Sequence, residues 1–344
     1  MERKGTLSLA VVGTDSLRGK EIKNVLEKSS FPLGRVEFFD PDVEEEYSKL
    51  TQFRGEAAVI HHLEEDHLEG LDLVFLAAER KVNRRLGNLA LKKKFQAIEL
   101  NETFNKEERI PVIVAGVNDD TITKDIPPLI ANPNPVTIIL SHLFHLLSER
   151  FGISRAIAFI LQPVSAFDDA GIGELAGQSV ALFNSASLPK KVFRNQIAFN
   201  LLSHTEKPGK DGFCPVEKQI IDEIKRVFRE REFPLSLSLV QAPVFHTYSI
   251  MSFIEMGKRA DIPDVEDVFK ESAFFNFYPP SISCPVSSIS VVGKDEICIG
   301  QIKKESSFPN SFWVWAVADN LTRGSALNAL EVAEKIFSVS RLIK

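Results

Sequence analysis

The sequence contains little cysteine and few aromatic residues that carry a polar group. Three cysteines occur in 344 residues, at positions 214, 284 and 298, and this number and scatter exclude a disulfide framework or a cysteine-based zinc site. Phe, with 26 residues, far outnumbers Tyr with 3 and Trp with 2, which is typical of aromatic packing in a dry core. We therefore expect a protein of the reducing cytoplasm.

Long apolar runs and an excess of positive charge are also missing. No stretch of about 18 apolar residues occurs, and residues 1–5 lead directly into a strand-like segment, so we expect neither a signal peptide nor a membrane partner. The net charge of −6 argues against nucleic acid as a partner, because phosphate binding requires clustered Lys and Arg. With 344 residues, of which 44% are apolar, the chain is long enough for about two domains.

The first part of the chain alternates between apolar strands and amphipathic helices. Nearly continuous apolar strands that alternate with helices predict an α/β fold with a parallel, doubly wound sheet of the Rossmann type. We expect strands at residues 6–13, 35–39, 71–77, 95–100 and 112–115, and helices at 17–28 and 82–93, with residues 129–131 as the approach to a central turn.

A turn with the sequence Ala-Asn-Pro-Asn-Pro-Val-Thr, residues 131–137, connects this part to the rest of the chain. Asn134 is a good N-cap because its side chain can accept a hydrogen bond from an unpaired backbone N–H. Pro135 follows at the first helical position, where a missing N–H costs nothing. The apolar run after it predicts a buried helix that Gly152 closes.

The second part of the chain has a different texture, with longer alternating strands and a segment rich in Ser, Pro and Phe. We expect an α+β layer with a mixed sheet, in which residues 235–244 and 248–256 are antiparallel strands around a turn. Further strands are expected at 156–164, 288–292 and 297–302, and helices at 173–184, 216–231 and 325–338.

A glycine-containing turn follows the first strand and opens the first helix, where a dinucleotide-binding fold places its phosphate loop. The spacing is that of a Gly-x-x-Gly-x-x-Gly motif with Ser16 in the middle, and Asp15 adds a carboxylate close to the expected pyrophosphate. The alternative is a tight turn that only packs the helix on the strand. The candidate cofactor-binding residues of this turn are Gly13, Thr14, Ser16, Leu17 and Gly19.

Asp40 ends the second expected strand and is a further candidate for cofactor binding. An acid at this place accepts a hydrogen bond from a ribose 2′-hydroxyl and repels a 2′-phosphate. If NAD or NADP binds, Asp40 therefore favours NAD. The alternative is that Asp40 caps the end of the strand before Pro41.

Two groups of histidines have the composition of metal ligands but not their spacing, and we assign no metal site. The first group lies among acidic residues and is expected in a solvated loop. It comprises His61, His62 and His67. In the second group, His142 and His145 share a helical stripe with Glu149, and we interpret both as core histidines.

Cys214, His246 and Tyr248 are the remaining side chains with chemical potential. Cys214 precedes Pro215 and a helix start, which can lower the pKa of a thiol, although an unpaired structural thiol is favoured. His246 and Tyr248 lie in the expected turn between two strands and are candidate acid–base groups.

Several short motifs resemble the aspartate-semialdehyde dehydrogenase family, and within it most resemble the usg-type paralogues, which lack the catalytic cysteine. Their order and spacing extend over nearly the whole chain. The matching stretches are residues 13–19, 116–118, 131–134, 162–165, 175–179, 195–200, 240–245 and 319–329. The resemblance implies a dinucleotide-binding domain at 1–133, to which a last helix at 325–344 returns, a dimerisation domain at 134–324, and a homodimer.

The family reduces aspartyl phosphate with NADPH through a cysteine thiolate, a histidine that handles protons, and arginines that hold the substrate. These roles require a good nucleophile and guanidinium groups that grip anions. The sequence departs from this pattern at each of these positions. The nucleophile is replaced by Pro135, the histidine by Tyr248, the substrate arginine by Gln241 and the phosphate-binding arginine by Asn105.

Some positions of the family's site remain. Gln162, Asn134 and Glu217 match it, whereas the lysine expected near residue 218 is either Lys218 out of register or Gln219. We therefore expect a catalytically inactive relative, which serves as a binding or structural protein and pairs with itself or with another protein.

Two other hypotheses remain open. One is an NAD(P)-dependent oxidoreductase that uses Tyr248 or His246 as an acid instead of a cysteine. The other is a working semialdehyde dehydrogenase with a displaced cysteine, such as Cys214 or Cys284.

Overall fold

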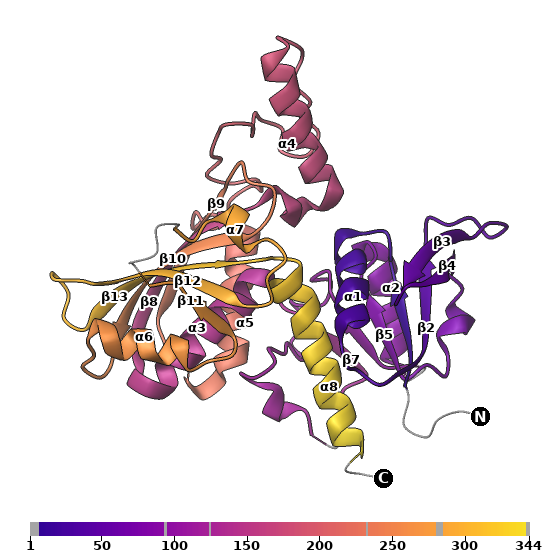
Figure 1. The fold of residues 1–344 in the computed structure, drawn as a ribbon, viewed down its shortest axis with the longest axis horizontal. Helices are drawn as coiled ribbons and strands as arrows, with labels where there is room; N and C mark the ends of the chain where they lie inside the picture. The colour runs from indigo at the N-terminus through magenta and orange to yellow at the C-terminus, as the bar shows by residue number, and fades with distance from the viewer. Residues whose placement is uncertain (1–6, 93–94, 124, 232, 280–284, 342–344) are drawn as a thin grey trace. The chain divides into compact units, whose positions relative to one another are not determined.

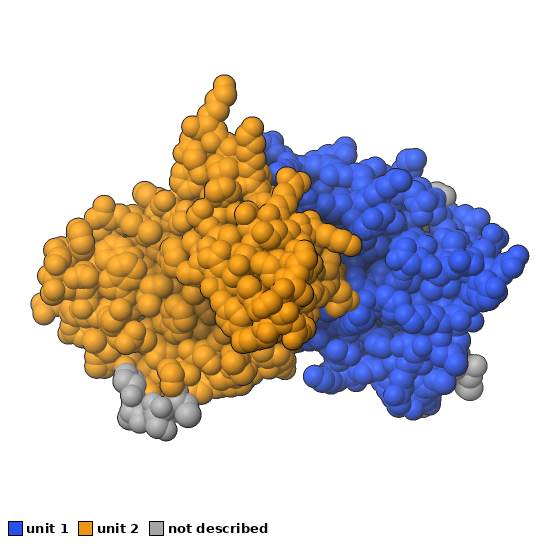
Figure 2. All heavy atoms as spheres, turned by 90° about the horizontal axis from the view of Figure 1, so that it is seen from above, with its two compact units in different colours: residues 1–134, 325–344 blue, residues 135–324 orange. Residues whose placement is uncertain are grey.

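A computed structural model of the protein describes residues 7–92, 95–123, 125–231, 233–279 and 285–341. The chain divides into two compact units (Figure 2). Unit 1 consists of Met1–Asn134 and Ser325–Lys344, and unit 2 of Pro135–Gly324. No helix in the described part of the chain has both the length and the apolarity required to span a bilayer.

Unit 1 is built on a seven-stranded sheet with the order β3-β4-β2-β1-β5-β6-β7 (Figure 1). All neighbouring strands in it are parallel except β3 and β4, which form an antiparallel hairpin. The strands are β1 (Leu7–Val12), β2 (Leu33–Asp40), β3 (Lys49–Phe53), β4 (Glu56–His62), β5 (Leu73–Leu76), β6 (Ala97–Glu99) and β7 (Leu129–Ala131). The helices are α1 (Leu17–Lys28), α2 (Arg80–Ala90) and α8 (Leu327–Arg341). The expected doubly wound sheet is confirmed.

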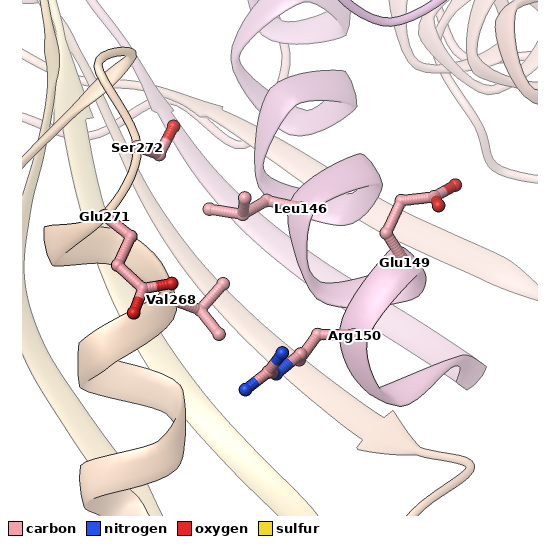
Figure 3. Close-up of a pocket in the computed structure, with 6 residues that line it drawn as sticks. All are labelled: Leu146, Glu149, Arg150, Val268, Glu271 and Ser272. Atoms are coloured by element: carbon pink, nitrogen blue, oxygen red, sulfur yellow. The ribbon is translucent and has the colours of Figure 1, made fainter.

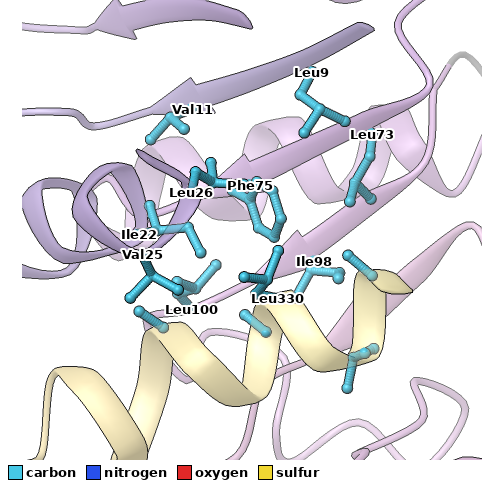
Figure 4. Packing of buried hydrophobic residues seen from close by; sticks show 14 of the residues in the cluster. Leu9, Val11, Ile22, Val25, Leu26, Leu73, Phe75, Ile98, Leu100 and Leu330 are labelled. Carbon is cyan, nitrogen blue, oxygen red and sulfur yellow. The ribbon is translucent and has the colours of Figure 1, made fainter. Parts of the chain in front are cut away.

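The core of unit 1 explains why the last helix belongs to it. Leu9 and Val11 of β1 pack in one cluster with α1 and with Leu330 of α8 (Figure 4). Because side chains alternate along a strand, Ala10 and Val12 point to the opposite face of the sheet. The helices α1 and α8 therefore cover one face with apolar side chains.

Unit 2 contains a six-stranded mixed sheet with the order β11-β12-β13-β10-β8-β9 (Figure 1). Its strands are β8 (Ile153–Gln162), β9 (Leu235–Gln241), β10 (Tyr248–Met256), β11 (Phe275–Phe277), β12 (Ile297–Lys304) and β13 (Ser311–Ala318). Its helices are α3 (Pro135–Phe151), α4 (Asp168–Phe183), α5 (Pro215–Phe228), α6 (Ile262–Lys270) and α7 (Ser288–Val291). The expected mixed sheet is confirmed.

The helix α3 begins at Pro135 and ends at Phe151, and Gly152 follows with a φ of +68°, in the left-handed region that terminates many helices. Twelve of its 17 residues are buried, so the prediction of a buried helix between a proline and a glycine is confirmed.

Three local predictions are wrong, and a fourth is wrong in part. Residues 112–115 form no strand beyond one bridge, because the backbone N–H groups of Val114 and Ala115 donate to the side chains of Asn118 and Asn328 instead. Residues 288–292 contain the short helix α7, whose N-terminus is capped by Ser287.

The expected pair of strands at 235–244 and 248–256 is also wrong. The strands β9 and β10 are not neighbours, because both pair with β8, β9 in parallel and β10 antiparallel. An alternating pattern indicates which face of a strand is buried but not which strand it pairs with. The prediction of a solvated loop for the first histidine group is wrong in part. His61 and His62 lie in the strand β4 instead.

Candidate functional site

The turn between β1 and α1 is closed so tightly that two of its residues must be glycine. Gly13 has a φ of +83°, and a Cβ atom on it would lie 2.4 Å from the backbone nitrogen of Ala78. A Cβ atom on Gly19 would lie 2.0 Å from the backbone oxygen of Gly13. The first turn of α1 therefore packs directly against the end of β1.

Ser16 is the N-cap of α1, and its Oγ accepts a hydrogen bond of 2.9 Å from the backbone N–H of Gly19. Leu17 is the first helical residue, and Thr14 is buried with its Oγ1 3.2 Å from the backbone oxygen of Phe39. The candidate cofactor residues of this turn thus lie together at a helix N-terminus beyond the carboxyl end of β1, which is a favourable place for a phosphate group.

Asp40 lies at the end of β2, and its carboxylate is already used by the backbone. Its Oδ2 accepts from the backbone N–H of Asp15 at 3.0 Å, and its Oδ1 accepts from that of Asp42 at 3.1 Å. Asp40 is only 3% exposed, whereas Asp15 is exposed and forms an ion pair with Lys49 at 2.6 Å. The carboxylate of Asp40 therefore holds the turn between β1 and α1 in place, and each of its oxygens retains a lone pair for a further donor.

A network of buried amides ties the start of α8 to the carboxyl end of the sheet in unit 1. Asn328 donates to the side-chain oxygen of Asn132 at 2.8 Å and to the backbone oxygen of Ile113 at 3.0 Å. Asn105 donates to the backbone oxygen of Asn132 at 3.3 Å. Asn105 thus presents a short amide in this network, with no positive charge to hold a phosphate.

Pro135 is buried at the start of α3, and its ring is packed against the backbone of Gly324. A Cβ atom on Gly324 would lie 2.9 Å from the Cβ of Pro135, so this contact also requires glycine. The preceding Asn134 donates from its Nδ2 to Glu102 at 3.0 Å. The position therefore offers neither a thiol nor a backbone N–H.

Gln162 and Gln241 end the paired strands β8 and β9 and are direct neighbours in register. The Nε2 of Gln241 donates to the backbone oxygens of Gln162 at 2.9 Å and of Ala242 at 3.1 Å. In the described part of the chain, the buried Oε1 atoms of both glutamines have no hydrogen-bond partner. The amide of Gln241 is thus committed to the backbone and unable to grip a carboxylate as a guanidinium would.

Tyr248 begins β10 and is 2% exposed, whereas His246, two residues earlier, is half-buried. Between them, Thr247 has a φ of +71°, which is a strained conformation for a β-branched residue. Its backbone N–H donates to Asn320 at 3.1 Å, and its hydroxyl donates to the backbone oxygen of Ser288. Sequence reasoning missed this strain, since nothing in the sequence marks a positive φ at a threonine.

Glu217 has a structural role in α5. Its two carboxylate oxygens accept from the backbone N–H groups of Cys214 at 2.7 Å and of Leu239 at 2.9 Å, which joins the start of α5 to β9. Burial, together with the charges of Glu217 and Glu206, raises the pKa of the Cys214 thiol. Cys214 is therefore a protonated, buried thiol rather than a thiolate. The neighbouring Lys218 forms an ion pair with the exposed Asp211 at 2.9 Å.

The histidines on α3 lie among aromatic and charged neighbours. His142 is 3% exposed and stacks on Phe274 with a ring-centre distance of 4.3 Å. Burial and the nearby charges of Arg323 and His145 lower the pKa of His142 well below its ordinary value. Among the residues that the structure describes, no group of three metal-ligating side chains occurs, and Glu149 pairs with Arg231 instead.

A surface pocket of about 450 Å³ lies next to this stripe, between α3 and α6 (Figure 3). Leu146 and Val268 point into it from the two helices, and the charged residues of its lining are Glu149, Arg150 and Glu271. None of the residues proposed from the sequence as part of a site lines its wall except Glu149, and we assign no chemistry to it.

The two units together define the class of protein: a two-domain α/β protein with a nucleotide-type parallel sheet and a second domain built on a mixed sheet. Residues 143–323, more than half of the chain, match the family model "Semialdehyde dehydrogenase, dimerisation domain", and residues 8–125 match "Semialdehyde dehydrogenase, NAD binding domain". The chain therefore belongs to the semialdehyde dehydrogenase family.

Relatives of known name are similar to the chain along almost its whole length. The aspartate-semialdehyde dehydrogenase of Rickettsia bellii is 28% identical over 332 residues, which cover 96% of this chain and 97% of the relative. The crystal structure of aspartate semialdehyde dehydrogenase II from Vibrio cholerae, complexed with ASA, has a TM-score of 0.90 at 24% identity, with 97% of this chain and 99% of that chain covered. The enzyme from Candida albicans with NADP has a TM-score of 0.72 at 14% identity, with 98% and 99% covered. The last two likenesses concern the fold alone.

Proposed function

We propose that this protein is a catalytically inactive, usg-type member of its family that retains a dinucleotide site and acts as a homodimer. The buried Pro135 carries the proposal. It stands where the family's motif has the cysteine, and its ring is packed against Gly324 with no nucleophilic atom. Covalent catalysis on an acyl phosphate requires such an atom, and its loss commonly costs about six powers of ten in rate.

Two further replacements support inactivity. Gln241, in place of the substrate arginine, donates to two backbone oxygens, and Tyr248, in place of the histidine, is buried and has a phenol whose usual pKa is far above neutrality. A substrate carboxylate would lack its bidentate partner, and a thiol at position 135 would lack its base.

Retention of a dinucleotide site is supported by the geometry of unit 1. Gly13 and Gly19 keep the tight turn, and Ser16 caps the helix beside it. We propose NAD rather than NADP as the ligand, because the buried carboxylate of Asp40 at the end of β2 would repel a 2′-phosphate.

A homodimer is supported by an open apolar face of the sheet in unit 2. Ile157 and Phe159 of the inner strand β8 are 49% and 46% exposed, whereas the intervening Ala158 is buried against the helices. Exposed apolar side chains in the middle of a sheet mark an interaction surface. A second copy of the chain is the occupant that the match to a dimerisation-domain model favours.

The alternative is an NAD(P)-dependent oxidoreductase that acts on a small carbonyl substrate with Tyr248 or His246 as the acid. The half-exposed His246 beside the strained Thr247 is the observation that favours it. A working enzyme with a displaced cysteine has less support, because the pKa of Cys214 is raised. Cys284 lies outside the described residues.

Two measurements test the proposal. Calorimetric titration of the purified protein with NAD and with NADP should show binding, with NAD the tighter ligand. An assay with aspartate semialdehyde, phosphate and either cofactor should show no turnover for the wild type or for Pro135→Cys, since the variant gains a thiol without a base or a substrate arginine. Turnover by the wild type that Cys214→Ser abolishes would overturn the proposal, and absence of binding to either cofactor would remove its cofactor component.

A further inference from the structure

Arg18 and Glu102 form a largely buried ion pair in unit 1, and neither residue has a role in the site described above. Arg18 is the second residue of α1, and its Nη2 lies 3.1 Å from the Oε1 of Glu102. Its Nη1 donates to the side chain of Asn101 at 3.0 Å. The side chains of Arg18 and Glu102 are only 12% and 11% exposed, so water screens this pair less than an exposed one.

The pair lies across the carboxyl ends of the parallel strands. Arg18 follows the phosphate loop after β1, Glu102 follows β6, and Asn134, which donates to the other oxygen of Glu102, follows β7. The order of the sheet places β2 and β5 on opposite sides of β1, so the chain changes direction there. Open α/β sheets bind ligands beyond the carboxyl ends at such a point. The ion pair therefore lies where a fold of this kind has its ligand-binding crevice.

Two features distinguish this pair from an ordinary structural salt bridge. Glu102 has a φ of +58°, a strained conformation for a residue other than glycine, and strain of this kind gathers at functional sites. The guanidinium of Arg18 divides its two donors between Glu102 and the neutral Asn101, rather than gripping one anion with both. A phosphate group could accept from both nitrogens, which is the geometry that guanidinium favours.

We propose that Arg18 binds a phosphate group of the ligand in this crevice, and that Glu102 is the internal carboxylate which this group displaces. The inference rests on the proposed dinucleotide site, which it deepens by naming the residue that meets the anion. The phosphate belongs either to the diphosphate of the dinucleotide or to a separate phosphate ion, and the experiment distinguishes these sources. Glu102 thereby lowers the affinity of the crevice for anions.

The test is calorimetric titration of the full chain with NAD, with ADP-ribose and with inorganic phosphate, at low salt. The proteins are the wild type, Glu102→Gln, Arg18→Gln and the double variant. Glu102→Gln should bind the phosphate-bearing probe about five- to thirtyfold more tightly, because the competitor is gone. Arg18→Gln should bind it more weakly by a similar factor, and the double variant should show no gain over Arg18→Gln alone.

Glu107→Gln is the matched control, because it removes one negative charge from an ion pair of unit 1, that with Arg84, without touching Arg18. An equal gain of affinity in this variant would show that the effect comes from the overall charge of the protein, and it would overturn the proposal. A gain that persists in the double variant, or no gain in Glu102→Gln, would also overturn it. If Glu102→Gln does not fold, Arg18→Lys replaces it in the test. A lysine keeps the positive charge but cannot donate two parallel hydrogen bonds, so the affinity of this variant for the probe should lie between those of the wild type and Arg18→Gln.

The probes separate this inference from the proposed function. A gain for NAD and ADP-ribose but not for inorganic phosphate assigns the anion to the dinucleotide, and a gain for inorganic phosphate assigns it to a separate phosphate ion. If neither NAD nor ADP-ribose binds, but the affinity for inorganic phosphate falls in Arg18→Gln, the cofactor proposal fails and this inference stands. If NAD binds equally to all variants and inorganic phosphate does too, this inference fails and the cofactor proposal stands.

Discussion

The buried His142 makes the stability of the protein sensitive to acid in a way that can be measured. Its ring stacks on Phe274, and the guanidinium of Arg323 lies 5.5 Å from the centre of that same ring. Burial first, and then the charges of Arg323 and His145, lower the pKa of His142 well below 6.5. The folded protein therefore holds this imidazole neutral at mildly acidic pH, at which the unfolded chain binds a proton there.

The sign and size of the effect follow from this difference. Above pH 6.5 His142 is neutral in both states, and it contributes no pH dependence. Below it, each pH unit costs at most about 1.4 kcal/mol of unfolding free energy until the folded pKa is reached, so pH 5 costs up to about 2 kcal/mol. His142→Phe keeps a ring for the contact with Phe274 but cannot titrate.

Urea unfolding of the wild type and His142→Phe at pH 8 and pH 5 checks this prediction. The difference in unfolding free energy between the two proteins should shift by up to about 2 kcal/mol in favour of the variant at pH 5. His204→Gln, which changes an exposed histidine, is the control and should show a smaller shift. If the shift for His142→Phe stays within about 0.5 kcal/mol of that control, the reasoning from burial is wrong.

The remaining predictions concern the phosphate loop and the dimer. In thermal unfolding, Gly13→Ala should destabilise the protein by about 2 kcal/mol more than Gly55→Ala. Both glycines have a positive φ, but only an alanine at position 13 would place its Cβ against the backbone of Ala78. Equal losses of stability in the two variants would contradict this close contact. Phe159→Glu should halve the mass in sedimentation analysis by placing a charge on the open face of the sheet, whereas Leu50→Glu, on an exposed strand of unit 1, should leave the mass unchanged. An unchanged mass for Phe159→Glu would remove the sheet face from the proposed interface.

Much of the site could be predicted because its chemistry is local. A proline after Asn134 excludes a thiol there in any fold, and Gly19 is required by its contact with the backbone of Gly13 in the same turn. The start of α3 at Pro135 and its end before Gly152 were predictable for the same reason, since a proline at the first helical position and a glycine after the last act within one helical turn.

Other features depended on partners distant in the sequence. The alternation of residues 235–256 identified two strands, but only the sheet decided that β8 separates them. Residues 112–115 are apolar enough for a strand, yet Asn328, more than 200 residues away, takes a backbone N–H that a strand partner would have used.

The sequence by itself determined the class of fold and the residues proposed for the family's catalytic positions, because apolar periodicity, glycine spacing and side-chain identity are properties of the chain. Only the tertiary structure decided how polar residues are used: Gln241 and Glu217 bind backbone groups, Asp40 holds the turn between β1 and α1, and Arg18 pairs with Glu102. The physical reason is that a polar side chain bonds to whichever donor or acceptor the fold brings within about 3 Å of it. Separation along the sequence does not reveal which groups come that close.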